Sequence, residues 1–192
     1  MPRRLRTATG GLAYHVINRA VARWTLFEKD ADYQAFERVI AETHARLPTR
    51  LLAYSVMPNH FHLVLWPEED GELSEFMRLL TVTHTQRYHA NRHSAGTGPL
   101  YQGRFKSFPI QQDEHLLTVM RYVERNPLRA GRVERAELWR WGSAWQHRQS
   151  ELPAWLLPAG KWPVDRRRDW ASWVNRPQSA KEEAAIRLSV NR

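Results

Sequence analysis

Two apolar segments separated by a two-residue turn signal constrain the fold of this chain more than any other feature. Residues 51–57 and residues 61–66 are both rich in apolar side chains, and Pro58 and Asn59 separate them. Proline has a fixed φ and asparagine tolerates the left-handed region, so both residue types favour turns. The pattern therefore predicts an antiparallel hairpin.

Strand and helix patterns alternate on either side of this hairpin. Residues 12–18 and 105–111 are predicted strands because β-branched and aromatic side chains are frequent there. Apolar residues recur at helical spacing over residues 30–47 and 72–90, which predicts two amphipathic helices. Residues 91–99 contain Gly, Ser, Thr and Pro without periodicity and are predicted to form a surface loop.

A third helix is predicted to begin after Asp113, which is a plausible N-cap. It should end at Asn126, because Pro127 disfavours helical geometry in the residue before it. The order is then strand, helix, strand, strand, helix, strand, helix, which is typical of an α+β, ferredoxin-like split βαβ fold. We expect an antiparallel sheet with helices on one face and the other face open to a ligand.

The composition changes near residue 138. Four prolines and seven of the nine tryptophans follow this point: Trp139, Trp141, Trp145, Trp155, Trp162, Trp170 and Trp173. We predict one domain over residues 1–148, followed by a Trp- and Pro-rich appendage over residues 149–192. Residues 178–190 are expected to form a short helix.

The charge of the chain indicates a polyanionic partner. There are 29 Lys and Arg residues against 20 Asp and Glu residues, a formal net charge of +9 with a sequence pI of about 10.4. Basic and aromatic residues interleave in a way that could neutralise phosphates and stack on unpaired bases. The alternative is a solvated basic face. The basic residues concerned are Arg3, Arg4, Arg6, Arg104, Lys106, Arg121, Arg125, Arg129 and Arg132.

Several classes of protein are excluded or disfavoured. The absence of cysteine excludes a disulfide framework, a thiolate zinc finger and a cysteine nucleophile. No apolar run of signal-peptide length follows the basic N-terminus. Residues 51–67, the longest segment without Lys, Arg, Asp or Glu, contain Pro58, Asn59 and two histidines and do not suit a bilayer span. We expect a soluble, cytoplasmic protein without a membrane association.

Two pairs of residues could carry chemistry. His60 and His62 should project from the same face of a strand because side chains alternate there, and two imidazoles on one face can share a cation. Alternatively, one histidine is packed under a helix and the other is solvated. Tyr122 and Asn126 are four residues apart in a helix and should lie on one face. They could instead be a core-edge aromatic and a helix-ending residue.

Three segments taken together resemble one family. They are SVMPNHFHL at residues 55–63, YQGRF at residues 101–105 and RYVERNPLRAG at residues 121–131. Their sequences and order resemble the single-tyrosine HUH transposases, and specifically the REP-associated tyrosine transposases of bacteria. The likeness covers about three quarters of the chain and includes the segment around Trp139 to Trp145.

This resemblance implies a ferredoxin-like catalytic domain that binds single-stranded, hairpin-forming DNA, cuts one strand and can rejoin it. His60 and His62 match the HUH pair that holds a divalent metal, here Mg²⁺ or Mn²⁺. Tyr122 matches the nucleophile that forms a 5′-phosphotyrosine, and Asn126 matches the third metal ligand, which is often Gln in the family. The resemblance leaves two oligomeric states open: classical insertion-sequence relatives act as dimers that exchange the tyrosine helix, whereas the REP-associated branch implies a monomer. We expect a monomer rather than a dimer, without an obligate protein partner.

Charge and proximity to the motifs make Arg3, Arg4, Arg104 and Lys106 candidates for phosphate contacts. Two other functions fit the same residues. One is an RRM-like module that binds hairpin DNA or RNA without catalysis, in which Tyr122 is structural. The other is a metal-dependent phosphodiesterase that uses water as nucleophile and forms no covalent adduct.

Overall fold

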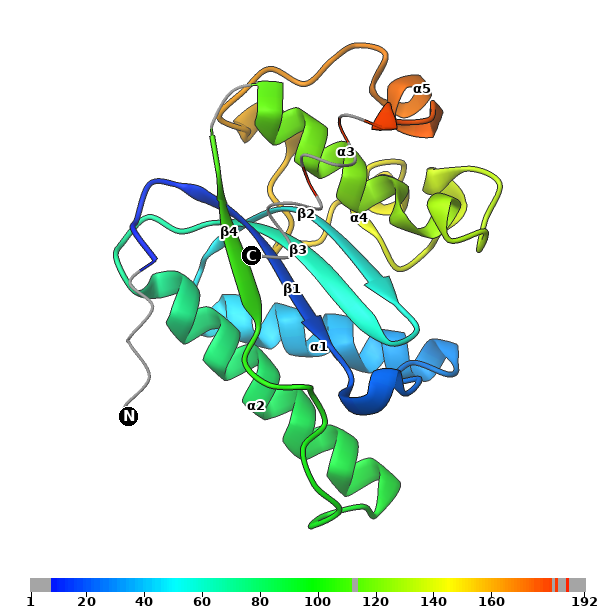
Figure 1. Ribbon diagram of the computed structural model, residues 1–192. Coiled ribbons are helices and arrows are strands. Elements are labelled where there is room, and N and C mark those ends of the chain that lie inside the picture. The colour runs from blue at the N-terminus through cyan, green and yellow to red at the C-terminus, as the bar shows by residue number, and fades with distance from the viewer. Residues whose placement is uncertain (1–7, 112–113, 181, 183–185, 187–192) are drawn as a thin grey trace.

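The computed structural model describes residues 8–111, 114–180, 182 and 186. Its order of strands and α-helices is β1 (Ala13–Arg19), α1 (Asp30–Arg46), β2 (Arg50–Met57), β3 (His60–Trp66), α2 (Glu72–Arg92), β4 (Lys106–Ile110), α3 (Glu114–Arg129), α4 (Ser143–Gln146) and α5 (Trp170–Asn175). Short 3₁₀ turns lie at Val21–Arg23, Ala136–Leu138 and Ala159–Lys161. Figure 1 shows the sheet between two groups of helices.

The four strands form one antiparallel sheet in the order β2-β3-β1-β4. In the predicted hairpin, Met57 pairs with His60 and Val56 pairs with Phe61, so Pro58 and Asn59 form the two-residue turn. This strand order and the element order confirm the α+β, ferredoxin-like fold class.

The first face of the sheet is covered by α1 and α2. Alternate residues of the strands, such as Val16, Phe61 and Leu63, point into this core. They meet the buried stripe of each helix, including Phe36 of α1 and Phe76 of α2. The expectation of helices on one face of the sheet holds for these two helices.

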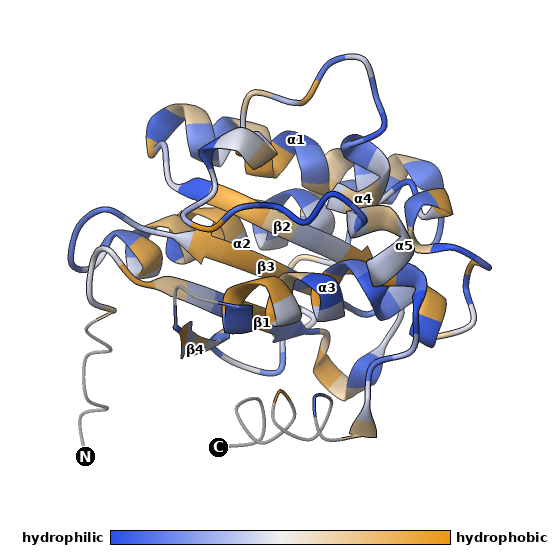
Figure 2. Ribbon diagram, turned by 90° about the horizontal axis from the view of Figure 1, so that it is seen from above, coloured by the Kyte–Doolittle hydropathy of each residue, from blue (hydrophilic) through white to orange (hydrophobic). Residues whose placement is uncertain are grey.

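The second face is not open along its whole length, because α3 lies across β2 on that side. Leu52, Ala53 and Val64 of the sheet pack with Leu116 and Met120 of α3. Figure 2 shows β2 and β3 hydrophobic along most of their length, as expected for strands that are covered on both faces. The near-continuous apolar pattern of residues 51–57 and 61–66 is consistent with a second covered face, and the prediction missed this helix placement.

The end of α3 also differs from the prediction. The helix continues through Pro127 to Arg129 instead of ending at Asn126. A proline removes one backbone hydrogen bond, but Asn126 and Pro127 are both buried. Packing of this last turn compensates for the lost bond. Asp113, the expected N-cap, lies outside the described residues.

The C-terminal segment docks on the second face rather than standing apart. Trp162, Trp170 and Val174 join the core that contains α3. The backbone N–H of Leu157 donates to the carbonyl of Leu51, which attaches the segment to β2. Most of the expected helix over residues 178–190 lies outside the described residues, and the division at residue 148 stays a prediction. Within the described part of the chain, no helix combines the length and apolarity of a membrane span.

Candidate active site

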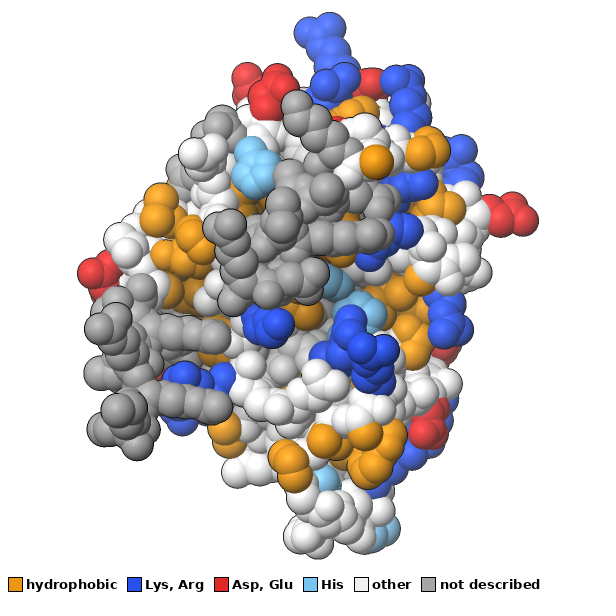
Figure 3. All heavy atoms as spheres, in the orientation of Figure 1, with side chains coloured by type: hydrophobic (Ala, Val, Ile, Leu, Met, Phe, Trp, Pro, Cys, Tyr) orange, Lys and Arg blue, Asp and Glu red, His pale blue; other side chains and the backbone are white. Residues whose placement is uncertain are grey.

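A cleft of about 760 Å³ lies between the second face of the sheet, the end of α3 and the loop before β4. Six of the eight residues selected from the sequence line it: His60, His62, Arg104, Lys106, Tyr122 and Asn126. The other two, Arg3 and Arg4, lie outside the described residues. Figure 3 shows histidine atoms near the middle of one face of the molecule, beside Lys and Arg side chains.

His60 and His62 lie on the α3 side of β3, with ring centroids 5.0 Å apart. Phe61 between them points into the opposite core. Burial, together with the nearby Arg19 and Arg129, lowers the pKa of His60 to about 4. Burial also holds the pKa of His62 well below its usual range. Both imidazoles are therefore neutral at pH 7, which is the form that binds a metal.

Each of these rings is oriented by a hydrogen bond at Nδ1. His60 Nδ1 lies 2.6 Å from Asn59 Oδ1, and because this oxygen only accepts, the ring nitrogen donates. His62 Nδ1 lies 2.9 Å from Nε2 of His15, a buried histidine of β1. The Nε2 atom of each ring is the nitrogen that remains for a ligand.

The ring of Tyr122 on α3 packs against two histidines of the sheet. It contacts the rings of His15 and His62 edge-on, with centroids 6.0 Å apart in both pairs. Arg129, two turns later on the same helix, donates from Nη2 to the Tyr122 hydroxyl at 3.0 Å, and its guanidinium lies 4.6 Å from the ring centroid. The hydroxyl therefore faces a cation within the cleft.

Asn126 follows Tyr122 by one turn and is 3% exposed. Its Nδ2 atom is buried without a hydrogen-bond partner among the described residues. An unpaired buried N–H donor costs free energy, so an acceptor such as a phosphate oxygen beside this Nδ2 would be stabilising. The residues described contain no cluster of three His, Asp or Glu side chains suited to a metal. A metal contact from Asn126 would have to come from its Oδ1, because the amide nitrogen only donates. Two neutral imidazoles and one amide suit a weakly held divalent cation with open coordination positions.

Arg104, on the loop before β4, and Lys106, the first residue of β4, are exposed and line the cleft. Tyr101, at the start of this loop, is buried and its hydroxyl donates to Nδ1 of His84 on α2 at 2.6 Å. Burial lowers the pKa of His84 to about 4, so the ring is a neutral acceptor. The N–H of Gln102 donates to the carbonyl of Arg19 in β1. These bonds fix the position from which Arg104 extends.

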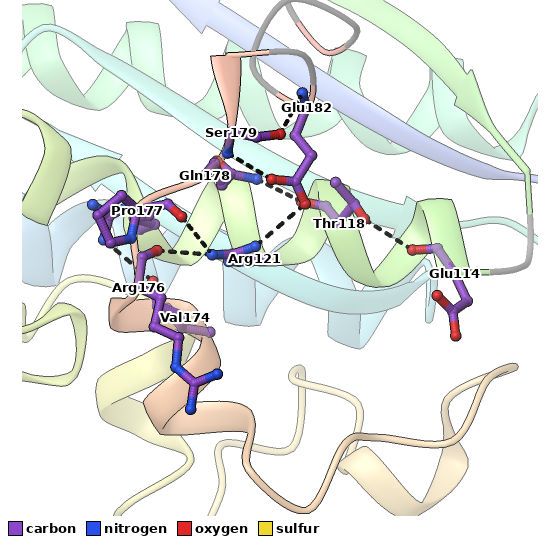
Figure 4. Close-up of polar contacts among 10 residues, drawn as sticks. Glu114, Thr118, Arg121, Val174, Arg176, Pro177, Gln178, Ser179 and Glu182 are labelled. Atoms are coloured by element: carbon purple, nitrogen blue, oxygen red, sulfur yellow. Dashed lines mark hydrogen bonds and ion pairs between the residues drawn. The ribbon is translucent and has the colours of Figure 1, made fainter.

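Two arginines of the basic set that could neutralise phosphates, Arg121 and Arg125, have another role. Nη2 of Arg121 donates to the carbonyls of Arg176 and Pro177, at 2.8 and 3.1 Å, and Arg125 donates to the carbonyl of Asn175 at 2.8 Å. Figure 4 shows Arg121 between the carbonyls of Arg176 and Pro177 and the carboxylate of Glu182, and the side chain is buried. For these two residues the phosphate interpretation was wrong, because the C-terminal carbonyls of α5 bind them instead.

Sequence reasoning missed three residues of the site: His15, Asn59 as a partner of His60, and Arg129 as a partner of Tyr122. His15 becomes a neighbour of His62 only through the register of β1 against β3, in which Ile17 is paired with His62. This register depends on contacts between segments 47 residues apart. The four-residue and seven-residue helical spacings from Tyr122 could have identified Arg129 as well as Asn126.

Comparisons with known proteins agree on a family. A family model described as "Transposase IS200 like" matches residues 8–126. A Haemophilus influenzae protein named as a REP-associated tyrosine transposase is 24% identical over 125 residues, which are 61% of this chain and 71% of that protein. The solved structure of a REP-associated tyrosine transposase bound to a REP hairpin matches with a TM-score of 0.59 and 23% identity. It covers 74% of this chain and 82% of the other. The structural match confirms the fold.

Proposed function

Because the chain belongs to the family of IS200-like transposases, we propose that it binds hairpin-forming single-stranded DNA and cleaves and rejoins one strand through Tyr122. The observation that supports this most directly is the placement of the tyrosine hydroxyl over a pair of neutral histidines in a basic cleft. Because the structural relative is bound to a REP hairpin, we expect hairpins from palindromic repeats to be the substrate.

The proposed step is a transesterification. The oxygen of Tyr122 forms a bond to the scissile phosphorus and gives up its proton, and the bond from phosphorus to the 3′-oxygen breaks. That oxygen takes up a proton and leaves as a 3′-hydroxyl, while a 5′-phosphotyrosine remains. Since one phosphodiester replaces another, the 3′-hydroxyl can reverse the step without a nucleotide cofactor.

The residues of the cleft have separate roles in this proposal. His60, His62 and Asn126 would hold Mg²⁺ or Mn²⁺, which withdraws charge from the phosphate. Arg129 positions the Tyr122 hydroxyl and stabilises the negative charge that develops on its oxygen. Arg104 and Lys106 bind the phosphates on either side of the scissile one.

The protein is further proposed to act as a monomer in the cytoplasm, because one chain supplies the cleft and its substrate is chromosomal DNA. Two alternatives remain distinguishable by experiment. An RRM-like binding module would hold the hairpin without cutting it. A metal-dependent phosphodiesterase would cut it with water and leave no protein attached.

The test uses labelled hairpin oligonucleotides from palindromic repeats of the source genome, incubated with protein and Mn²⁺ or with EDTA. We expect a protease-sensitive covalent band on a denaturing gel with Mn²⁺ and none with EDTA. Tyr122→Phe should remove the band and keep hairpin binding, whereas Tyr88→Phe, a half-buried tyrosine of α2, should change neither. Binding without a band in the wild-type protein would favour the binding module, and cleavage by Tyr122→Phe would favour water as nucleophile.

A further inference from the structure

Trp24 is the most exposed large apolar side chain of the described chain, with 65% of its surface accessible. All nine tryptophans lie among the described residues, and the other eight are buried or half-buried. Exposure of one apolar side chain is common on protein surfaces and does not by itself define a site. The backbone around Trp24 supplies the further argument.

Trp24 directly follows a strained turn. Ala22 and Arg23, in the 3₁₀ turn Val21–Arg23, have φ values of 49° and 59°. Residues with a Cβ atom rarely adopt this left-handed region, because the Cβ approaches the following carbonyl oxygen. Such conformations persist only where the surrounding structure enforces them, and they concentrate at functional sites.

The surrounding structure does enforce this turn. The N–H of Ala20 donates to the carbonyl of Asn59 at 2.9 Å, and the N–H of Val21 donates to the carbonyl of Leu100 at 3.0 Å. On the other side of Trp24, the N–H groups of Leu26 and Phe27 both donate to the carbonyl of Pro58. Figure 1 shows this segment beside the turn between β2 and β3. The indole is therefore presented to solvent by a fixed backbone.

A short chain of hydrogen bonds connects this turn to the cleft. Asn59 Nδ2 donates to the carbonyl of Arg23 at 3.2 Å, and Oδ1 of the same side chain accepts from His60 at 2.6 Å. Arg19, which precedes the turn, lines the cleft directly. The residue before Trp24 is thus hydrogen-bonded to Asn59, which in turn is bonded to His60 in the cleft.

The charges near Trp24 suit a nucleic acid. Arg19 lines the cleft and Arg23, the residue before Trp24, is exposed, so both are able to contact phosphates. The nearby Glu28 is paired with Arg92 at 3.1 Å, which offsets its negative charge. An exposed indole that follows an exposed arginine in the sequence suits unpaired bases, because every base has a face on which an aromatic ring stacks.

We propose that Trp24 is a stacking platform for an unpaired base of the DNA strand that leaves the cleft past His60. This inference rests on the proposed function, since it requires a single strand in the cleft. The ligand class is a nucleobase in single-stranded DNA, and the rigid turn keeps the indole in place before DNA binds.

The test measures dissociation constants in EDTA on a Tyr122→Phe background, so that no strand is cut. Two DNA probes are compared, a hairpin without extensions and the same hairpin with single-stranded extensions of about eight nucleotides on both sides, within the usual site size of single-strand binders. Trp24→Ala should weaken binding of the extended hairpin by about 5- to 150-fold, the range that loss of one base stack produces. It should leave the hairpin without extensions unaffected, and Trp24→Phe should recover most of the affinity.

Leu138→Ala is the matched control, because Leu138 is 54% exposed and does not line the cleft. It should bind both probes like the background protein. 2-Aminopurine placed at each extension position in turn should identify one position whose fluorescence is quenched with Trp24 and restored in Trp24→Ala. Thermal melting of each variant shows that it is folded.

The proposed stacking role of Trp24 would be contradicted if Trp24→Ala and the background protein bound the extended hairpin with equal affinity. An equal loss of affinity for both probes would also contradict this role of Trp24. So would a Trp24→Ala variant that loses self-association while its DNA affinity is unchanged. Failure of the proposed transesterification gives a different result. The wild-type protein would then form no covalent band with Mn²⁺, while the affinity for the extended hairpin would still depend on Trp24.

Discussion

Arg129 is the residue whose role is most directly testable at the level of single side chains. Its guanidinium contacts both the hydroxyl and the ring of Tyr122. Arg129→Lys keeps the charge but loses the planar fork of donors. We expect adduct formation to slow by about 10- to 100-fold, as when one donor to a developing oxyanion is lost, while hairpin affinity changes much less. Single-turnover kinetics and equilibrium binding measure the two quantities.

The matched control is Arg132→Lys, since Arg132 is exposed just beyond the same helix. It should leave the single-turnover rate unchanged. An equal loss of rate and of affinity in Arg129→Lys would mean that Arg129 only binds DNA, with no specific effect on Tyr122.

His15 is expected to act through His62. His15→Phe keeps a ring of similar size in the buried position and removes the hydrogen bond to His62 Nδ1. Loss of an outer partner of a metal-binding histidine typically lowers metal affinity by about 10- to 100-fold. Titration of Mn²⁺ followed by electron paramagnetic resonance measures this directly, and the exposed His93→Phe should have no effect. Unchanged Mn²⁺ affinity in His15→Phe would contradict the assignment.

For single residues, the sequence predicted which side chains share a face, because this depends only on local backbone geometry. His60 and His62 share a face because side chains alternate in any strand, and Tyr122 and Asn126 share a face because any helix has 3.6 residues per turn. The contacts of His15 and of the Arg121 guanidinium depend on tertiary structure. No local pattern distinguishes an arginine that binds phosphate from one that binds a carbonyl.

At the level of elements, α3 divides its residues between two surfaces. Tyr122, Asn126 and Arg129 face the cleft. Arg121 instead binds carbonyls just after α5 (Figure 4), and Arg125 binds the carbonyl of the last residue of α5. Glu124 is buried beside them and accepts from Ser143 Oγ at 2.7 Å and from Trp170 Nε1 at 2.8 Å. The C-terminal segment therefore holds the helix that carries the candidate nucleophile.

This arrangement predicts that Arg121 contributes to stability. Arg121→Met removes the donors to two carbonyls at the end of α5, and unfolding free energy should fall by about 2 kcal/mol. Urea denaturation measures the loss, and limited proteolysis should cut the chain near residues 176–180 faster. Arg132→Met should leave stability unchanged. Stability equal to wild type in Arg121→Met, with weaker DNA binding, would restore the phosphate interpretation.

At this scale, residue patterns placed the four strands, α1 and α2 correctly, but they did not predict the short helices α4 and α5. They did not predict that α3 continues through Pro127, because the proline signal is local and the burial of the last turn is not. They also did not predict that the tryptophans after residue 138 would pack against α3, because their number alone does not indicate what they contact.

For the whole molecule, buried histidines predict sensitivity to acid. The pKa of His84 is about 4 in the folded protein and about 6.5 when the chain is unfolded, because burial disfavours the charged ring. Between these values only the unfolded chain binds the proton, so stability falls as the pH falls from about 6.5 to about 4. For this residue the loss between pH 7 and pH 5 is about 2 kcal/mol.

Urea midpoints at pH 7 and pH 5 test this expectation. His84→Gln keeps an acceptor for Tyr101 but cannot be protonated, so its stability should fall less with acid than that of the wild-type protein. The exposed His93→Gln should show the wild-type dependence. An identical pH dependence in all three proteins would contradict the assignment to His84.

The attachment of α3 to its own sheet has a kinetic consequence. The four candidate residues come from one chain, and transfer of α3 to a second copy would first break buried contacts such as that between Glu124 and Ser143. The rate of adduct formation should therefore be first order in protein concentration. The rate per protein molecule should stay constant on serial dilution. A mixture of the Tyr122→Phe and His60→Ala variants should restore no activity, because an intact Tyr122 in one molecule cannot act together with an intact His60 in the other.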